Sequence, residues 1–131
     1  MSKFLEPLKV ELIDDSYNWR VLEPFDYDIG EVGGEKIVVP MGTITDFGSV
    51  PRLFWNIIPP IGPATRGFVL HDYLYQIQTY TRSKSDSILL EALGVLGIKW
   101  FKRWSIYLGV RSGGWLAWNS HTKELKDKKN V

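Results

Sequence analysis

GFVLHDYLYQIQTYTRSKSDSILLEALGVL, residues 67–96, holds the pattern that decides the fold. Leu70, Leu74 and Ile77 recur at steps of four and three residues, which is the spacing of one apolar face of a helix. We expect this helix to begin near residue 67 and to end near residue 80. The same stretch carries a histidine, several tyrosines and two aspartates beside the apolar face, so the segment that orders the fold also carries the unusual polar chemistry.

A second helix is predicted directly after the first. Ser83 and Asp86 have the spacing of a helix-capping box, with Ser83 as the N-cap and Asp86 three residues later. A helix of about three turns follows. Its apolar face consists of Ile88, Leu89, Ala92, Leu93 and Leu96. In this interpretation Asp86 serves the free amides of the first turn, and we favour that role over a chemical one.

The flanking sequence supports an α+β fold with strands first and helices last. Residues 1–40 read mainly as short strands at 8–12, 19–22 and 36–39, and they predict a small antiparallel sheet. Residues 41–66 contain four prolines and are predicted to form an ordered loop. Three helices are expected in the helical region 67–121, followed by a charged tail over 122–131. We expect residues 1–131 to form a single domain.

The third predicted helix begins after Gly97 and stops at Gly113-Gly114. Trp100, Trp104, Tyr107, Leu108 and Arg111 share one of its sides. Lys99, Lys102 and Arg103 lie on another side. This arrangement permits peripheral membrane contact, but a helix packed through its aromatic side is the favoured interpretation.

The composition excludes several classes of function. The formal charge is only +1, so there is no overall electrostatic drive toward nucleic acid, and we expect no nucleic-acid partner. The chain has no cysteine, which excludes disulfides and thiolate metal sites, and a reducing compartment is the simplest expectation. Because there are only two histidines, a zinc site is poorly supplied with ligands. Gly-rich nucleotide loops are also absent from the sequence.

The candidate chemical residues lie on the first two predicted helices. His71 and Tyr75 are one helical turn apart and point the same way, whereas Asp72 is rotated by about 100° from His71. If the second helix folds back antiparallel, Asp86 approaches His71. A carboxylate beside an imidazole fixes its tautomer, and such a pair is typical of hydrolases that activate water. A histidine that merely bonds a loop at the edge of the core is an equally acceptable reading.

The pattern His71-Asp72-x-x-Tyr75 followed by Asp86 resembles that of phospholipases A2, including the cysteine-free form in some viral capsid proteins. The resemblance implies that His71 is the catalytic base, Asp72 a Ca²⁺ ligand, Asp86 the histidine partner and Tyr75 its support. Met41-Gly42 and Gly62-Pro63 do not reproduce the glycine-rich calcium loop of that family.

A longer resemblance is carried by several segments in order. They are Val39-Pro40-x-Gly42, Thr45-Asp46-Phe47-Gly48-Ser49-Val50-Pro51-Arg52, His71-Asp72-Tyr73-Leu74-Tyr75, Asp86 and Tyr107-x-x-Val110-Arg111. Together they resemble an uncharacterised family of tailed bacteriophages and prophages, in which alanine is expected at positions 48 and 85. The resemblance implies phage origin and brings no established activity.

The remaining polar residues admit two readings. Thr45, Asp46 and Ser49 precede Pro51, and we favour a role in locking the loop through backbone amides. Ser49 as a nucleophile with His71 as its base is the less favoured alternative, because no strand–Gly-x-Ser-x-Gly–helix turn is present. In the structural reading, Arg52 and Arg111 pair with Asp46 or Asp72 and form a polar network.

Two functional hypotheses follow. The first is a phage virion or assembly protein that acts through contacts with other phage structural proteins, in the host cytoplasm during assembly and in the virion. The second is a small calcium-dependent hydrolase, similar to phospholipase A2, that acts on host envelope lipid. Burial of His71 and Asp72 separates them, because catalysis needs an open cleft beside the imidazole.

Overall fold

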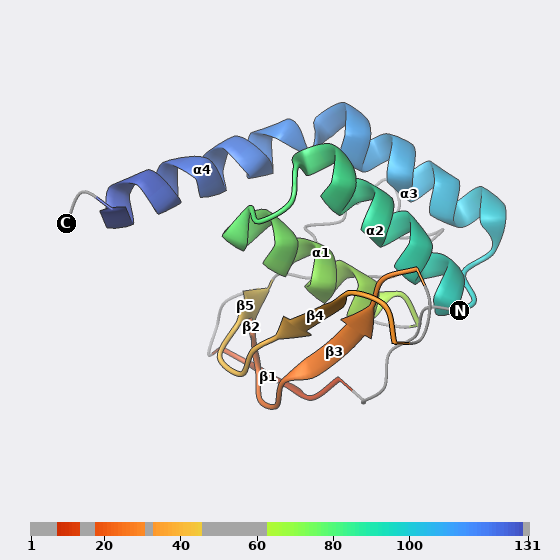
Figure 1. Cartoon of the computed structure of the whole chain (residues 1–131), viewed down its shortest axis with the longest axis horizontal. Helices are drawn as coiled ribbons and strands as arrows, with labels where there is room; N and C mark the ends of the chain where they lie inside the picture. The colour runs from red at the N-terminus through yellow and green to blue at the C-terminus, as the bar shows by residue number, and fades with distance from the viewer. Residues whose placement is uncertain (1–7, 14–17, 31–32, 46–62, 130–131) are drawn as a thin grey trace.

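A computed structural model of the chain describes residues 8–13, 18–30, 33–45 and 63–129. Within these residues the strands come first and the helices last, as Figure 1 shows. The expected α+β class with a small antiparallel sheet region is therefore confirmed.

The strands form two small antiparallel units. β1 (Val10–Leu12), β2 (Trp19–Val21) and β5 (Ile44–Thr45) make a three-stranded sheet in the order β1-β2-β5. β3 (Phe25–Asp28) and β4 (Lys36–Val39) make a hairpin in which Phe25 pairs with Val39. Side chains alternate along β4, where Ile37 and Val39 are buried and Lys36 and Val38 are exposed. This period of two directs one face of the hairpin toward the helices.

Strands β1, β2 and β4 match the predicted strands, whereas β3 and β5 were not expected. β3 reads Phe-Asp-Tyr-Asp and follows Pro24. Phe25 and Tyr27 alternate with aspartates and are both fully buried, but aspartate and a preceding proline are unfavourable signals for a strand. β5 is only two residues long and follows the turn at Gly42, whose φ is +89°. A pattern that short lies below the length at which periodicity can be recognised.

The described part of the chain contains four helices where three were expected: α1 (Thr65–Ile77), α2 (Arg82–Val95), α3 (Trp100–Gly113) and α4 (Trp115–Lys129). The predicted stop at Gly113-Gly114 is correct for α3. Gly114 itself, however, keeps right-handed helical angles, and the chain enters a new helix at once. The prediction that residues 122–131 form a charged tail is wrong as far as Lys129, because α4 includes them.

The boundary between α1 and α2 also differs from expectation. α1 ends at Ile77 rather than near Tyr80, because Gln78 adopts a left-handed conformation with φ +51°. The N-cap of α2 is Thr81, whose side chain accepts a hydrogen bond from the Lys84 amide at 3.1 Å. Ser83 is thus inside the helix, and the predicted capping box is wrong.

The core lies between the strands and the α1–α2 pair. Its fully buried members come from both sides, among them Val21, Phe25, Leu70, Leu74 and Leu93. Gly67 lets the two helices approach closely, because a Cβ atom at this position would lie 3.2 Å from the Leu93 side chain. This contact sets the spacing of α1 and α2 one turn before His71.

α3 and α4 run along the side of α1 and α2 that faces away from the strands, and together they form the outer edge in Figure 1. Neither helix contains a buried residue among those that the structure describes. Trp100, Trp104 and Leu108 are 67%, 46% and 60% exposed. The prediction that α3 packs through this aromatic side is therefore wrong.

Candidate functional site

The centre of the candidate site is the carboxylate of Asp86, which is fully buried in the second turn of α2. His71 Nε2 lies 2.7 Å from Asp86 Oδ1, and the Tyr75 hydroxyl donates to the same oxygen at 2.6 Å. Arg111 Nη1 donates to Oδ2 at 2.8 Å, and Arg82 Nη1 lies 3.6 Å from it. Both carboxylate oxygens are thus occupied by charged or strongly polar partners.

Three helices bring these groups together. His71 and Tyr75 share one face of α1 because they are one turn apart, and Asp86 meets them from the antiparallel helix α2. Arg111 reaches over from the last turn of α3. The His71 and Tyr75 rings pack with centroids 4.2 Å apart, and Trp118 of α4 stands edge-on to Tyr75 at 5.0 Å. The prediction that folding brings His71 and Asp86 together is borne out by this geometry.

The partners of Asp86 keep it ionised. Burial alone would raise the pKa of this carboxyl, but hydrogen bonds from His71, Tyr75 and Arg111, together with the charge of His71, hold the pKa below its ordinary value. Burial, and then the bond to Asp86, raise the pKa of the Tyr75 hydroxyl above its ordinary value. Tyr75 therefore stays protonated and serves as a hydrogen-bond donor.

This charge state fixes the tautomer of His71. An ionised carboxylate only accepts hydrogen bonds, so Nε2 of His71 carries a proton that it donates to Asp86. In the neutral ring the lone pair is then on Nδ1, the nitrogen on the other side of the ring. The contact therefore orients the ring so that Nε2 faces Asp86 and Nδ1 faces away from it. His71 is buried, with 6% of its surface exposed, and it is not among the residues that line the pocket described below. The open cleft that catalysis needs beside the imidazole is therefore not seen in the described residues, and burial by itself favours the structural role.

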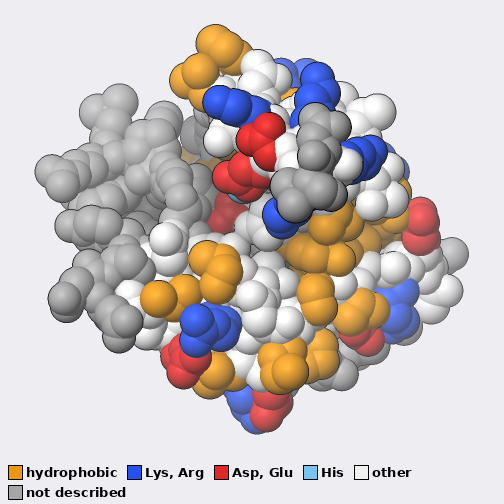
Figure 2. All heavy atoms as spheres, turned by 90° about the vertical axis from the view of Figure 1, so that its left-hand side faces the viewer, with side chains coloured by type: hydrophobic (Ala, Val, Ile, Leu, Met, Phe, Trp, Pro, Cys, Tyr) orange, Lys and Arg blue, Asp and Glu red, His pale blue; other side chains and the backbone are white. Residues whose placement is uncertain are grey.

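Asp72 faces a different neighbour from His71, as predicted. The Thr45 hydroxyl of β5 donates a hydrogen bond to Asp72 Oδ2. Both residues line a pocket of about 470 Å³ between the β1-β2-β5 sheet, α1 and α4. The other lining residues are Asn18, Gly42, Ile44, Gln76, His121, Glu124, Leu125 and Lys128. Figure 2 looks onto this end of the molecule, where the surface is hollowed and acidic side chains stand near basic ones.

The described side chains do not by themselves make a calcium site. Asp72 offers the hard oxygen ligand that Ca²⁺ prefers, and Glu124 lines the same pocket. No group of three or more His, Cys, Asp or Glu that could hold a metal ion occurs in the described parts of the chain. The described side chains around Asp72 therefore supply too few ligands to hold Ca²⁺ by themselves.

Several sequence predictions about the site need correction or lie outside the described residues. Arg111 pairs with Asp86, not with Asp46 or Asp72 as predicted. Asp86 is not a capping residue, because its buried carboxylate binds side chains of two other helices. The predicted network members Asp46, Ser49 and Arg52 lie outside the described residues.

Sequence reasoning missed two residues of the site. Arg82 donates to the Val110 carbonyl at 3.1 Å and lies beside Asp86, four residues later on the same helix. That spacing was a usable signal, because residues four apart share a helix face. Trp118 lies near the end of the region predicted to be helical, and nothing in its local sequence indicates a contact with Tyr75.

Comparisons with known proteins give a family but no activity. Residues 19–110 match the protein family described as "Protein of unknown function (DUF1353)". A curated relative, the "Uncharacterized protein y4jT" of Sinorhizobium fredii, is 28% identical over 104 residues. The match covers 78% of this chain but 31% of the relative, so the chain spans under a third of that protein's length. No solved structure matches the chain.

Proposed function

The chain belongs to the DUF1353 family of proteins of unknown function, and from its own residues we propose that it is a small ester hydrolase. In this proposal His71 is the general base. The observation that supports this proposal most directly is the 2.7 Å contact between His71 Nε2 and the buried Asp86 carboxylate. The proposal requires that the imidazole, which is 6% exposed, be uncovered to admit water and substrate. Tyr75 supports the same carboxylate oxygen at 2.6 Å.

In the proposed reaction, Nδ1 of His71 takes a proton from a water molecule while the water oxygen adds to the ester carbonyl carbon. The resulting tetrahedral intermediate breaks its bond to the alcohol oxygen, and the imidazolium returns the proton to that oxygen. The products are a carboxylic acid and an alcohol. Asp86 stays ionised throughout and offsets the positive charge of the imidazolium, while Tyr75 and Arg111 hold the carboxylate in place.

Phospholipid is the substrate class that we propose. The pattern His71-Asp72-x-x-Tyr75 with Asp86 resembles phospholipase A2, and the contacts of His71 and Tyr75 with Asp86 support this choice of substrate class. The resemblance assigns Ca²⁺ to Asp72, which lines the pocket, but the described side chains around it supply too few ligands, so the proposed reaction includes no metal step. Host envelope lipid, met during entry or lysis, is the corresponding biological substrate.

The test is fatty-acid release from phospholipid vesicles, measured with added calcium and with a chelator, for the parent protein and for His71→Gln. Loss of a general base lowers the rate by roughly 10²–10⁴-fold. Tyr80→Phe is the matched control, because Tyr80 bonds Glu35 rather than the Asp86 carboxylate. Equal, calcium-indifferent release by the parent and His71→Gln would eliminate the hydrolase proposal.

A second candidate function is a bacteriophage virion or assembly role through protein contacts. It is supported by the resemblance of the ordered sequence segments to a phage family and by the exposed large apolar side chains on α3 and α4. In this role the partners are other phage structural proteins, and the His71–Asp86 cluster stabilises the fold. Mass spectrometry of purified particles tests it, and particles without the protein would remove a stable virion role.

A further inference from the structure

The outer surface of α3 and the start of α4 exposes large apolar side chains. Trp100, Trp104 and Leu108 follow one another at steps of four residues along α3, which places them in one row. Phe101 of α3, whose ring meets that of Trp100, and Trp115 and Leu116 of α4 are exposed as well, and the six side chains are between 46% and 67% exposed. We call these six residues the aromatic face. Solvent-exposed groups of this size mark interaction surfaces.

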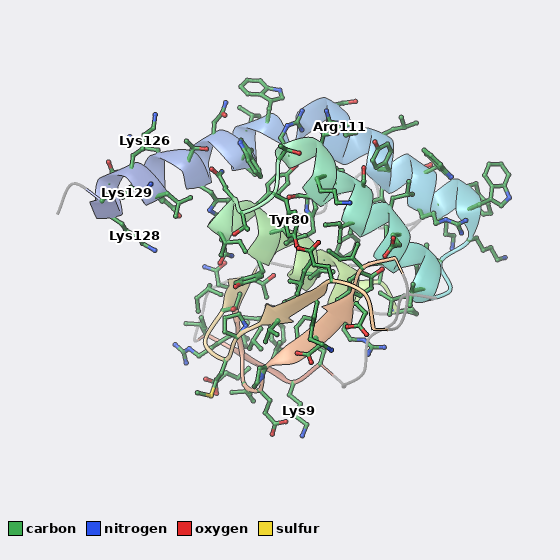
Figure 3. The ribbon with its side chains drawn as sticks, viewed as in Figure 1. Lys9, Tyr80, Arg111, Lys126, Lys128 and Lys129 are labelled. Carbon is green, nitrogen blue, oxygen red and sulfur yellow. The ribbon has the colours of Figure 1, made fainter. Side chains whose placement is uncertain are left out.

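The same two helices carry an unequal share of the charge. Residues 99–129 contain eight of the sixteen Lys and Arg but only two of the fifteen Asp and Glu, which gives them a formal charge of +6 in a chain of +1. Lys126, Lys128 and Lys129 lie in the last turn of α4, together with Asp127. Figure 3 places these three lysines at the free end of α4, far from Lys9 on the strand side. Lys128 lines the pocket beside the strands, which leaves Lys126 and Lys129 for a contact outside it. The aromatic face thus belongs to a strongly basic pair of helices.

We propose that the α3–α4 pair docks on an anionic phospholipid bilayer, with the aromatic face in the headgroup region and the lysines of α4 against the lipid charges. Tryptophan is favoured at this depth because its ring is apolar while its N–H bonds headgroups. Lysines near an anionic leaflet add attraction that acts over about a Debye length. No helix in the described residues is long and apolar enough to cross a membrane. In the proposed docking the two helices lie in the plane of the bilayer surface.

Other occupants fit these residues less well. Residues 99–129 keep a formal charge of +5 when Arg111, which is paired with Asp86, is left out. A symmetric contact between two copies through the aromatic face would bring two such helix pairs of like charge together, which is unfavourable. Nucleic acid is bound by cations that follow the phosphates, whereas the exposed row on α3 is apolar and its neighbours include Ser105 and Gly109. A bilayer surface with anionic lipid offers apolar depth and negative charge together.

Vesicle flotation tests the proposal with the whole chain, and binding does not require hydrolysis. Vesicles containing phosphatidylglycerol should carry the protein, while pure phosphatidylcholine vesicles should bind on the order of tenfold less because the lysines lose their partners. Trp100→Ser/Trp104→Ser should weaken binding by on the order of tenfold or more, since two interfacial anchors are removed. The matched control is Val38→Ser/Met41→Ser, which removes apolar groups that are 46% and 70% exposed on the strand side.

A charge variant distinguishes the contribution of the α4 lysines to vesicle binding from that of the aromatic face. Lys126→Gln/Lys129→Gln should weaken binding to the anionic vesicles by about tenfold at low salt and by less at high salt, while Lys9→Gln leaves binding unchanged. Absence of vesicle binding, or equal effects of the strand-side and α3 variants, would overturn the proposal. So would self-association that Trp100→Ser/Trp104→Ser abolishes, or binding to duplex DNA that is tighter than binding to the anionic vesicles.

Discussion

The two helix pairs of this molecule contrast in what they bury. α1 and α2 contribute most of the helical core, and between them they hold the Asp86 carboxylate away from water. α3 and α4 have similar lengths and more tryptophan, yet the structure describes no buried residue in either. Hydrophobic residues at helical spacing therefore predict a helix in both pairs but not what the helix packs against. The first pair holds the fold together, and the second offers a surface.

The largest expected effect comes from removing the charge that joins the two pairs. Asp86→Asn leaves Arg111 without its buried partner, and we expect a loss of about 3 kcal/mol in the free energy of unfolding. Urea denaturation measures it. Asp28→Asn is the matched control, because Asp28 is also buried but its partners Gly33 and Lys36 belong to its own hairpin rather than to other helices. If both variants lost the same amount, Asp86 would have no special part in joining the helix pairs.

The same carboxylate predicts a dependence of stability on acid. The pKa of Asp86 in the folded protein is lowered from 3.8, so its contribution is complete above that pH and is lost as the pH falls toward the folded value. The free energy of unfolding should therefore decrease from about pH 4 downward, and more steeply in the parent than in Asp86→Asn. Urea titrations of both proteins between about pH 6 and about pH 3 measure the difference. Parallel curves would show that another group carries the acid sensitivity.

A steric change at the joint of α3 and α4 tests how tightly the second pair is held against the first. A Cβ atom at Gly114 would clash with the Val110 carbonyl and lie 2.7 Å from the Tyr75 hydroxyl. Gly114→Ala should therefore destabilise the protein by about 2 kcal/mol and displace Tyr75 from Asp86. Gly113→Ala is the control, because nothing lies within 4 Å of a Cβ at that position. Equal melting temperatures for the two variants would contradict the contact.

In the α1–α2 pair, the Ser85 hydroxyl is buried without a hydrogen-bond partner among the described residues. Ser85 itself is fully buried in α2. Alanine is the residue that the phage-family resemblance leads us to expect here. Ser85→Ala should stabilise the protein by about 1 kcal/mol, because a buried unpaired hydroxyl is removed and helix propensity improves. Thermal unfolding measures this, with exposed Ser87→Ala as the control.

The contrast between the two helix pairs also explains which features of the fold and of the site could be predicted from the sequence. The spacing of Leu70, Leu74 and Ile77 is local information, and it led to α1 and to the side by side placement of His71 and Tyr75. Arg111 was expected to pair with an aspartate, but its choice of Asp86 depends on how α3 crosses α2, which no local pattern encodes. The exposure of Trp100 likewise depends on tertiary structure, because no described element covers it. Its position in the sequence does not distinguish it from a tryptophan that is buried in a core.

The smallest expected effect concerns the aromatic face itself. If α3 contributes surface rather than core, Trp100→Ser/Trp104→Ser removes side chains that are 67% and 46% exposed and should change the free energy of unfolding by no more than about 0.5 kcal/mol per site. Phe68→Ser, at 3% exposure in α1, is the buried comparison and should cost about 3 kcal/mol or more. Urea denaturation of the three proteins in the absence of lipid measures both. A large loss in the tryptophan variant would mean that these side chains stabilise the fold, and the aromatic face would then be no free docking surface.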